Sequence, residues 1–213
     1  MSLADQLTQR REATAQALPA DTFATMNSIT QQLKASGIED AAPKAGEQFK
    51  SFNLPNQNGE LRQLETLLAN GPVVITFYRG GWCPYCNLEL AAYQAQLENI
   101  KAAGATLVAI TPELPDESLS TAEKNALSFE VLSDEGSNYA RQLGIMFTLA
   151  PELVPIYAKF GTDIEQYNGK GNLELPLSAT FIIAKDGKVM HASVDADYTY
   201  RQEPAEIVAL LNA

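Results

Sequence analysis

The two cysteines of this 213-residue chain are three positions apart, in Cys83-Pro84-Tyr85-Cys86. Two cysteines placed at random in a chain of this length would show that spacing roughly once in a hundred cases. On a helix, a spacing of three residues puts both sulfur atoms on one face, within reach of a disulfide bond. The pair is therefore the first candidate for thiol redox chemistry.

The elements expected around the pair suit a reactive thiolate. Residues 72–78 form a continuous apolar run typical of a buried strand, and a helix is expected from about Cys83 to Ala103. A free thiol has a pKa near 8.5, and lowering it to about 6 needs about 3.4 kcal/mol, whereas the helix macrodipole supplies about 0.3–2 kcal/mol. A cation must therefore help, and the candidates are Arg79, Arg141 and Arg201.

Other interpretations of the pair stay open. Both residues could be buried structural cysteines, or they could form a redox sensor that is not an enzyme. A zinc or iron–sulfur site needs two further ligands, and the chain offers only His191 and carboxylates, so neither a metal nor another cofactor is expected. We expect His191 to be a half-exposed strand residue, with a general base as the lesser alternative.

The composition excludes some classes of partner. The net charge is −11 and the isoelectric point is about 4.5, which disfavours nucleic acid and anionic membrane surfaces. No apolar run approaches the roughly 18 residues that span a bilayer, and polar residues such as Asp5 and Gln6 interrupt any secretory signal. The expected compartment is the cytoplasm, where a cysteine pair is more often catalytic than structural.

The periodicity predicts an α/β protein with an N-terminal helical extension. Residues 1–45 are expected to hold two helices that pack on the domain or on a second subunit, which allows a homodimer. Residues 46–213 are expected to form one domain with a thioredoxin-like core, because a parallel strand–helix–strand unit comes first and a hairpin comes last. The expected elements after the first helix are strands at 105–111 and 130–132, helices near 116–127 and 137–143, a hairpin at 179–194 and a helix at 204–211.

Two later segments each allow two structural interpretations. The apolar stripe Leu153, Ile156, Tyr157 and Phe160 is expected to be core, with a dimer face as the alternative. The segment DADYTYRQEP (195–204) contains Tyr198, Arg201 and Glu203, which could line the mouth of the site. A solvated turn is the favoured interpretation of that segment.

Residues from about Gly46 to Val194 resemble the peroxiredoxins of the alkyl hydroperoxide reductase and thiol-specific antioxidant group, and more closely the branch that carries C-x-x-C. The stretches that carry the resemblance are SFNLPNQNGE (51–60), FYRGGWCPYCNLEL (77–90), VLSDEGSNYARQLGI (131–145) and ATFIIAKDGKV (179–189). The resemblance implies a thiol peroxidase, with Cys86 at the position of the peroxidatic cysteine. Arg79 stands where the family motif has proline, Cys83 where it has threonine, and Ser178 near the place of its distant arginine.

A second register resembles thioredoxin, whose Trp-Cys-Gly-Pro-Cys matches Trp82 to Cys86. In that register Cys83 attacks and Cys86 resolves, so the resemblance leaves the nucleophile open. The hypotheses are a peroxidase that reduces hydrogen peroxide or organic hydroperoxides, a thioredoxin-like disulfide oxidoreductase, and the redox sensor. The implied partners are a peroxide or disulfide substrate and a thiol electron donor, which could be thioredoxin, glutaredoxin or glutathione.

Overall fold

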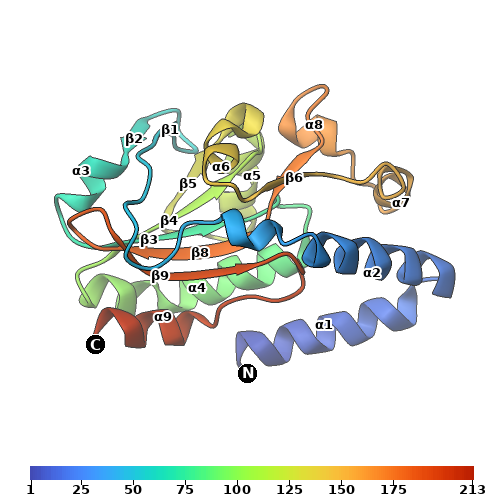
Figure 1. Cartoon of the computed structure of the whole chain (residues 1–213), viewed down its shortest axis with the longest axis horizontal. Helices are drawn as coiled ribbons and strands as arrows, with labels where there is room; N and C mark the ends of the chain where they lie inside the picture. The colour runs from blue at the N-terminus through green and yellow to red at the C-terminus, as the bar shows by residue number, and fades with distance from the viewer.

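The computed structural model describes residues 1–213 (Figure 1). Its α-helices are α1 (Leu3–Ala17), α2 (Ala20–Ala35), α3 (Leu64–Leu68), α4 (Pro84–Ala102), α5 (Pro115–Lys124), α6 (Asn138–Gln142), α7 (Val154–Lys159), α8 (Ile164–Asn168) and α9 (Pro204–Leu211). Its strands are β1 (Asn53–Pro55), β2 (Leu61–Gln63), β3 (Val73–Phe77), β4 (Thr106–Thr111), β5 (Glu130–Ser133), β6 (Met146–Thr148), β7 (Glu174–Pro176), β8 (Ser178–Ile183) and β9 (Val189–Asp195). Short 3-10 helices lie at Ile38–Ala41 and Glu135–Ser137.

The central sheet has the order β5-β4-β3-β8-β9. Strands β3, β4 and β5 are parallel, because β3 and β4 are joined through α4 and β4 and β5 through α5. Strand β8 runs antiparallel to β3, and β9 completes a hairpin with β8. The predicted parallel crossover and late hairpin are both confirmed, and with them the thioredoxin-like core.

Two hydrophobic cores cover the two faces of this sheet. Because side chains alternate along a strand, Ile75 and Phe77 of β3 face one core, while Val74 faces the other. The first core includes residues of α3 and α6, and the second includes residues of α4, α9 and α1. Figure 1 shows α4, α9 and α1 on one side of the sheet and α3 and α6 on the opposite side. Helix α4, which begins at the cysteine pair, is therefore held in this core by the sheet and by helices α1 and α9.

The N-terminal extension packs on the same chain. Leu3 and Leu7 of α1 are buried in the core beneath α4. The carboxylate of Glu203 accepts hydrogen bonds from the first N–H groups of α1, at Leu3 and Ala4, over 3.3 and 3.2 Å. Arg11 donates to the carbonyl oxygen of Thr199 at 3.0 Å. Helix α1 thus holds the segment between β9 and α9, and the domain boundary at residue 45 stays a prediction.

The segment between β6 and β7 differs in part from its expected role. Leu153 and Tyr157 are buried in a small core, as the apolar stripe predicted. Phe160 is 48% exposed, so its assignment to the core is wrong, because α7 ends at Lys159 and leaves it at the rim of a cavity. No helix of the chain is both long and apolar enough to cross a membrane.

Candidate active site

The cysteine pair lies at the start of α4, the helix that follows β3. Pro84 is the first residue of the helix, where its missing N–H leaves no hydrogen bond unmade. Both thiols are free and buried, with Cys83 at 1% exposure and Cys86 at 0%. Cys83, and not Cys86, is among the residues that line a cavity of about 510 Å³, so the two cysteines differ in their position relative to this cavity.

Two glycines and a buried carboxylate fix the loop before the helix. Gly80 has φ of +151°, and a Cβ there would lie 2.2 Å from Nε1 of Trp82. A Cβ on Gly81 would lie 2.0 Å from Oγ1 of Thr121. Glu113, just after β4, accepts a hydrogen bond from the N–H of Gly81 at 2.9 Å. Neither position has room for a side chain, so the two glycines permit this tight loop.

Arg201 makes the closest contact of a cation with the pair. Its Nη2 donates to Sγ of Cys86 at 3.3 Å, and its Nε pairs with Oε2 of Glu89 at 2.6 Å. The side chains of Arg201 and Glu89 are each 1% exposed. The guanidinium also donates to the carbonyl oxygen of Tyr198. The favoured interpretation of this segment as a solvated turn is therefore wrong for Arg201, because the pairing with Glu89 compensates its burial.

Arg201 lies near the place left by the family's distant arginine. Ser178, the first residue of β8, stands there, and its buried hydroxyl has no hydrogen-bond partner. Ser178, Glu89 and Arg201 line one polar cavity of about 250 Å³. The guanidinium of Arg201, from the segment after β9, thus reaches the region where the resemblance placed an arginine near the start of β8.

Arg79 is buried without a carboxylate partner. It is 2% exposed, and its guanidinium lies over the rings of Tyr198, Trp82 and Tyr157 at 4.3, 4.9 and 5.5 Å. It donates to the hydroxyl of Tyr157, while its Nε has no partner. Cation–π contacts stabilise such a guanidinium but do not neutralise it. A negative charge on Cys83 would therefore be favourable at this place.

The environment separates the acidities of the two thiols. Burial opposes ionisation of Cys83, but hydrogen bonding from Cys86 and the positive charges of Arg79 and Arg201 together outweigh it and lower its pKa to about 6. Burial and the neighbouring Cys83 raise the pKa of Cys86 well above its ordinary value. One negative charge shared by the pair therefore resides mainly on Cys83.

Two buried carboxyl groups adjoin the pair. Burial raises the pKa of Glu89 to about 7, against the opposing charge of Arg201. Burial likewise raises the pKa of Glu113 to about 7, although the N–H of Gly81 and the hydroxyl of Tyr78 favour its carboxylate. Both groups can exchange a proton near neutral pH. No group of three or more His, Cys, Asp or Glu side chains is arranged to hold a metal ion.

The sequence also singled out Trp82, Arg141 and His191, and the structure places these residues differently relative to the cysteine pair. Trp82 lines the cavity beside Cys83 and packs against Tyr157 with ring centroids 5.6 Å apart. Arg141 pairs with Glu174 at the surface and lines no cavity with the cysteines, so the structure does not bring it to the site. His191 is half-buried on β9 and lies 3.3 Å from Gln202, as the strand-residue interpretation predicted.

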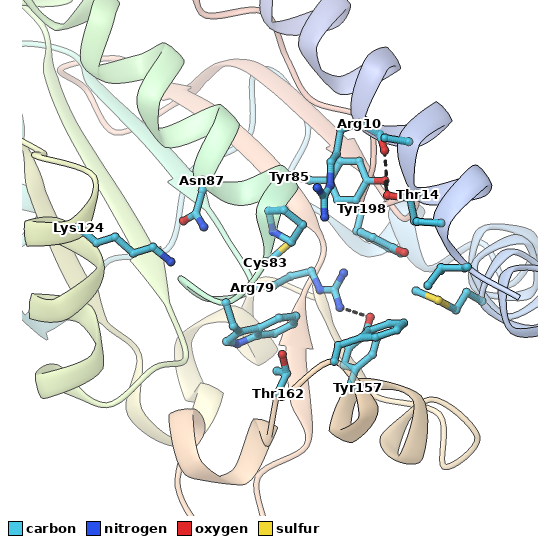
Figure 2. A pocket seen from close by; sticks show the side chains of 17 residues that line it. Arg10, Thr14, Arg79, Cys83, Tyr85, Asn87, Lys124, Tyr157, Thr162 and Tyr198 are labelled. Carbon is cyan, nitrogen blue, oxygen red and sulfur yellow. Dashed lines mark hydrogen bonds between the residues drawn. The ribbon is translucent and has the colours of Figure 1, made fainter.

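Figure 2 shows the cavity above Cys83. Its volume is about 510 Å³, and helix α1 forms one wall with Arg10 and Thr14. Tyr85 and Tyr198 stand between that wall and Arg79, whose guanidinium points toward Tyr157 (Figure 2). The N-terminal extension, for which the sequence predicted only packing, is therefore part of the candidate site.

Comparison with known proteins agrees with this geometry. The profile of the AhpC/TSA family matches residues 45–192, which include both cysteines. The chain belongs to the AhpC/TSA family. This AhpC/TSA protein is 30% identical over 113 residues to a putative peroxiredoxin of Mycobacterium tuberculosis, covering 53% of the chain and 73% of that relative. It is 31% identical over 102 residues to the peroxiredoxin Bcp of Escherichia coli, covering 48% and 65%.

The fold of this AhpC/TSA protein is that of solved peroxiredoxin structures. The crystal structure of peroxidoxin BcpB from Mycobacterium tuberculosis matches with a TM-score of 0.63 and 25% identity, over 80% of this chain and 97% of that one. Peroxiredoxin 6 of Arenicola marina matches with a TM-score of 0.63 and 18% identity, over 79% and 72%. Both Tyr198 and Arg201 lie beyond the residues that the family profile matches, as do α1 and α2.

Proposed function

We propose that this protein is a thiol-dependent peroxidase in which Cys83 is the nucleophile and Cys86 resolves the oxidised intermediate. The observation that carries this order is the difference between the two sulfur atoms. Cys83 lines the cavity and its pKa is lowered to about 6, so most of it is thiolate at neutral pH. Cys86 is fully buried behind it and stays protonated.

The reaction has three steps. The thiolate of Cys83 attacks the terminal oxygen of a hydroperoxide, an S–O bond forms, the O–O bond breaks, and an alcohol or water leaves after taking up a proton. The thiol of Cys86 then attacks the sulfenic sulfur, a disulfide forms, and water leaves. An external dithiol, or two molecules of a monothiol, reduces the disulfide and is itself oxidised.

The two arginines support different steps of this sequence. Arg79 lies beside Cys83 and favours its thiolate before the attack and the negative charge on the departing oxygen during it. Arg201 contacts Cys86, and its positive charge favours the thiolate that Cys86 must become when it attacks. Glu89, paired with Arg201, is placed to accept the proton that Cys86 releases.

The proposal also covers the substrates and the reductant of this catalytic cycle. We include hydrogen peroxide and organic hydroperoxides as substrates, and thioredoxin, glutaredoxin or glutathione as the reductant. The peroxiredoxin register, in which Cys86 attacks first, is the competing assignment. Its difficulty is that Cys86 is fully buried and does not line the cavity that Cys83 lines.

A disulfide oxidoreductase is the second candidate function. The acidic thiol that lines the cavity belongs to the first cysteine, as in the thioredoxin register of Trp82 to Cys86. In that reaction Cys83 attacks a substrate disulfide and Cys86 resolves the mixed disulfide. Reduction of insulin disulfides, measured beside peroxide consumption with the same thiol donor, separates the two functions.

Stopped-flow oxidation of the reduced protein by hydrogen peroxide tests the peroxidase. Trp82 is the only tryptophan of the chain and adjoins Cys83, so its fluorescence reports on the pair. We expect oxidation much faster than that of a free thiolate, followed by catalytic turnover with a thiol donor. A rate no faster than a free thiolate, with both hydrogen peroxide and organic hydroperoxides, would contradict the proposal. Fast stoichiometric oxidation without turnover would instead favour a redox sensor.

A further inference from the structure

Two buried guanidinium groups lie beside the cysteine pair, but only one of them has a carboxylate partner. Arg201, whose side chain is 1% exposed, pairs with Glu89 at 2.6 Å. Arg79 is 2% exposed, and its side chain donates only to the hydroxyl of Tyr157, while its Nε has no partner. A buried cation without an anion is costly, so Arg79 needs a negative charge from another group.

The remaining buried carboxyl group near the pair does not supply that charge. Glu113 accepts hydrogen bonds from uncharged groups, namely the N–H of Gly81 and two hydroxyl groups. No carboxylate lines the cavity that Arg79 and Cys83 share. Figure 2 shows these two side chains next to each other in this cavity. The thiolate of Cys83 is therefore the anion that compensates Arg79.

Oxidation of the pair removes this anion. The reduced pair carries one thiolate and one thiol, and formation of the disulfide releases two electrons and one proton. The site then holds one buried cation without compensation. Cys83 is also the N-cap of α4, where the helix macrodipole favours a negative charge that the disulfide lacks. Both effects stabilise the reduced form, and a disulfide whose reduced form is stabilised is a strong oxidant.

We propose that the disulfide form of this protein oxidises dithiols, passing its disulfide to a substrate that carries two thiols. A substrate thiolate attacks Sγ of Cys83, which lines the cavity, the S–S bond breaks, and Cys86 leaves as a thiolate beside Arg201. The second substrate thiolate attacks the substrate sulfur of the mixed disulfide, and Cys83 leaves as a thiolate beside Arg79. Of the two protons that the substrate loses, one goes to Cys86 and the other to the solvent.

The renewal of the disulfide by a peroxide rests on the peroxidase function proposed above, whereas the oxidising strength of the pair does not. Each full cycle consumes one hydroperoxide and one dithiol, and it yields an alcohol or water, a further water and a substrate disulfide. Electrons therefore pass from the dithiol to the protein, opposite to the direction in which an insulin-reducing oxidoreductase works.

The stability of the two redox forms tests the charge argument without any peroxide. The protein is oxidised with diamide, and urea unfolding at pH 7 compares this form with the reduced protein. We expect the oxidised form to unfold at a lower urea concentration, although a disulfide ordinarily stabilises a protein by constraining the unfolded chain. An oxidised form at least as stable as the reduced one would overturn the proposal.

Equilibration with reduced and oxidised glutathione measures the oxidising strength, with acid quenching and alkylation to count the free thiols. We expect Arg79→Gln to raise the [GSH]²/[GSSG] ratio at half-reduction at least tenfold, which corresponds to one pKa unit in the thiolate. Arg79→Lys keeps the charge and should stay close to the unaltered protein. Arg141→Gln, at a surface ion pair, is the control and should not change the ratio. An unchanged ratio in Arg79→Gln would contradict the assignment.

Transfer to a dithiol completes the test. The diamide-oxidised protein is mixed with an equimolar reduced peptide that contains two cysteines, and mass spectrometry measures the peptide disulfide. We expect most of the peptide to become oxidised while the protein becomes reduced. Persistence of the oxidised protein beside the reduced peptide would overturn the proposal and leave the peroxidase standing. Transfer to the peptide without turnover of any peroxide would keep the oxidant and remove the peroxidase.

Discussion

The guanidinium of Arg201 donates to the sulfur of Cys86 at 3.3 Å, although 115 positions separate the two residues in the sequence. The same guanidinium pairs with Glu89 at 2.6 Å, one helical turn beyond Cys86. Arg201 lies outside the region matched by the family profile. The environment of Cys86 therefore depends on a cation that the C-terminal segment brings back to α4.

The order of attack is tested by single cysteine variants. We expect Cys83→Ser to abolish sulfenic acid formation, because it removes the thiol whose pKa is lowered to about 6. Cys86→Ser should let the sulfenic acid accumulate on Cys83, because the resolving thiol is gone. Trapping with dimedone and peptide mass spectrometry identifies the modified residue. Accumulation on Cys86 in the Cys83→Ser protein would establish the peroxiredoxin register instead.

The charge of Arg79 should set the acidity of Cys83. Removing it by Arg79→Gln should raise the pKa of that thiol from about 6 toward its ordinary value, so the midpoint of its alkylation rate moves to higher pH. Arg79→Lys keeps a positive charge and should retain most of the low midpoint. Arg141→Gln, at a surface pair with Glu174, serves as the control. Identical pH profiles for Arg79→Gln and the unaltered protein would show that Arg79 does not act on the thiol.

The buried pair of Arg201 and Glu89 should be strongly coupled. Arg201→Gln leaves the carboxyl of Glu89 buried without its cation, and we expect it to lower the free energy of unfolding by about 3 kcal/mol. The double variant Arg201→Gln, Glu89→Gln removes both charges and should recover most of that loss. Urea unfolding of the unaltered protein, the two single variants and the double variant, all reduced, gives the free energies of this double-mutant cycle. Strict additivity of the two single changes would rule out the coupling.

Glu113 should make stability depend on pH. Its pKa is raised to about 7 in the folded protein, so between pH 4.5 and 7 the folded state holds a proton that the unfolded chain has released. The free energy of unfolding must therefore fall as the pH rises through this window, by at most about 3 kcal/mol for this group.

Glu113→Gln isolates that contribution. Glutamine can still accept from the N–H of Gly81 but does not titrate, so we expect a flatter decline of stability between pH 4.5 and 7. Part of the decline should persist, because the pKa of Glu89 is raised in the same direction. Urea unfolding across the pH range measures both slopes, and parallel curves would contradict the role given to Glu113.

The sequence predicted the fold and the cysteine pair because both depend on local patterns. The apolar run that became β3 and the stripe of α4 fix their elements without reference to distant residues. The three-residue spacing of Cys83 and Cys86 is likewise local. Glu89 was missed, although its place three residues after Cys86 puts it on the same buried face of α4. Glu113 was missed too, and its place just after β4 was the available signal.

The contacts between distant segments could not be predicted. Arg79, Arg141 and Arg201 are equivalent from sequence alone, because nothing local shows which guanidinium packs against the sulfur atoms. The structure brings both Arg79 and Arg201 to the pair and leaves Arg141 at the surface. Arg201 reaches Cys86 from the segment that α1 holds by the hydrogen bond from Arg11 to Thr199. The contribution of α1 to the cavity could not be predicted either, because it depends on contacts between distant segments. Arg10 lies on the polar side of α1, and nothing else in the sequence of this helix indicates a site.

The separation of Cys86 from Arg201 also has a consequence during synthesis. Translation proceeds at about 5–20 residues per second, so the separation of 115 positions delays Arg201 by roughly 6 to 23 seconds after Cys86. During that interval the nascent chain carries both thiols but lacks one of the two guanidinium groups that favour ionisation at the pair. The cysteines therefore gain their full acidity only after Arg201 has been synthesised and the C-terminal segment has docked against α4.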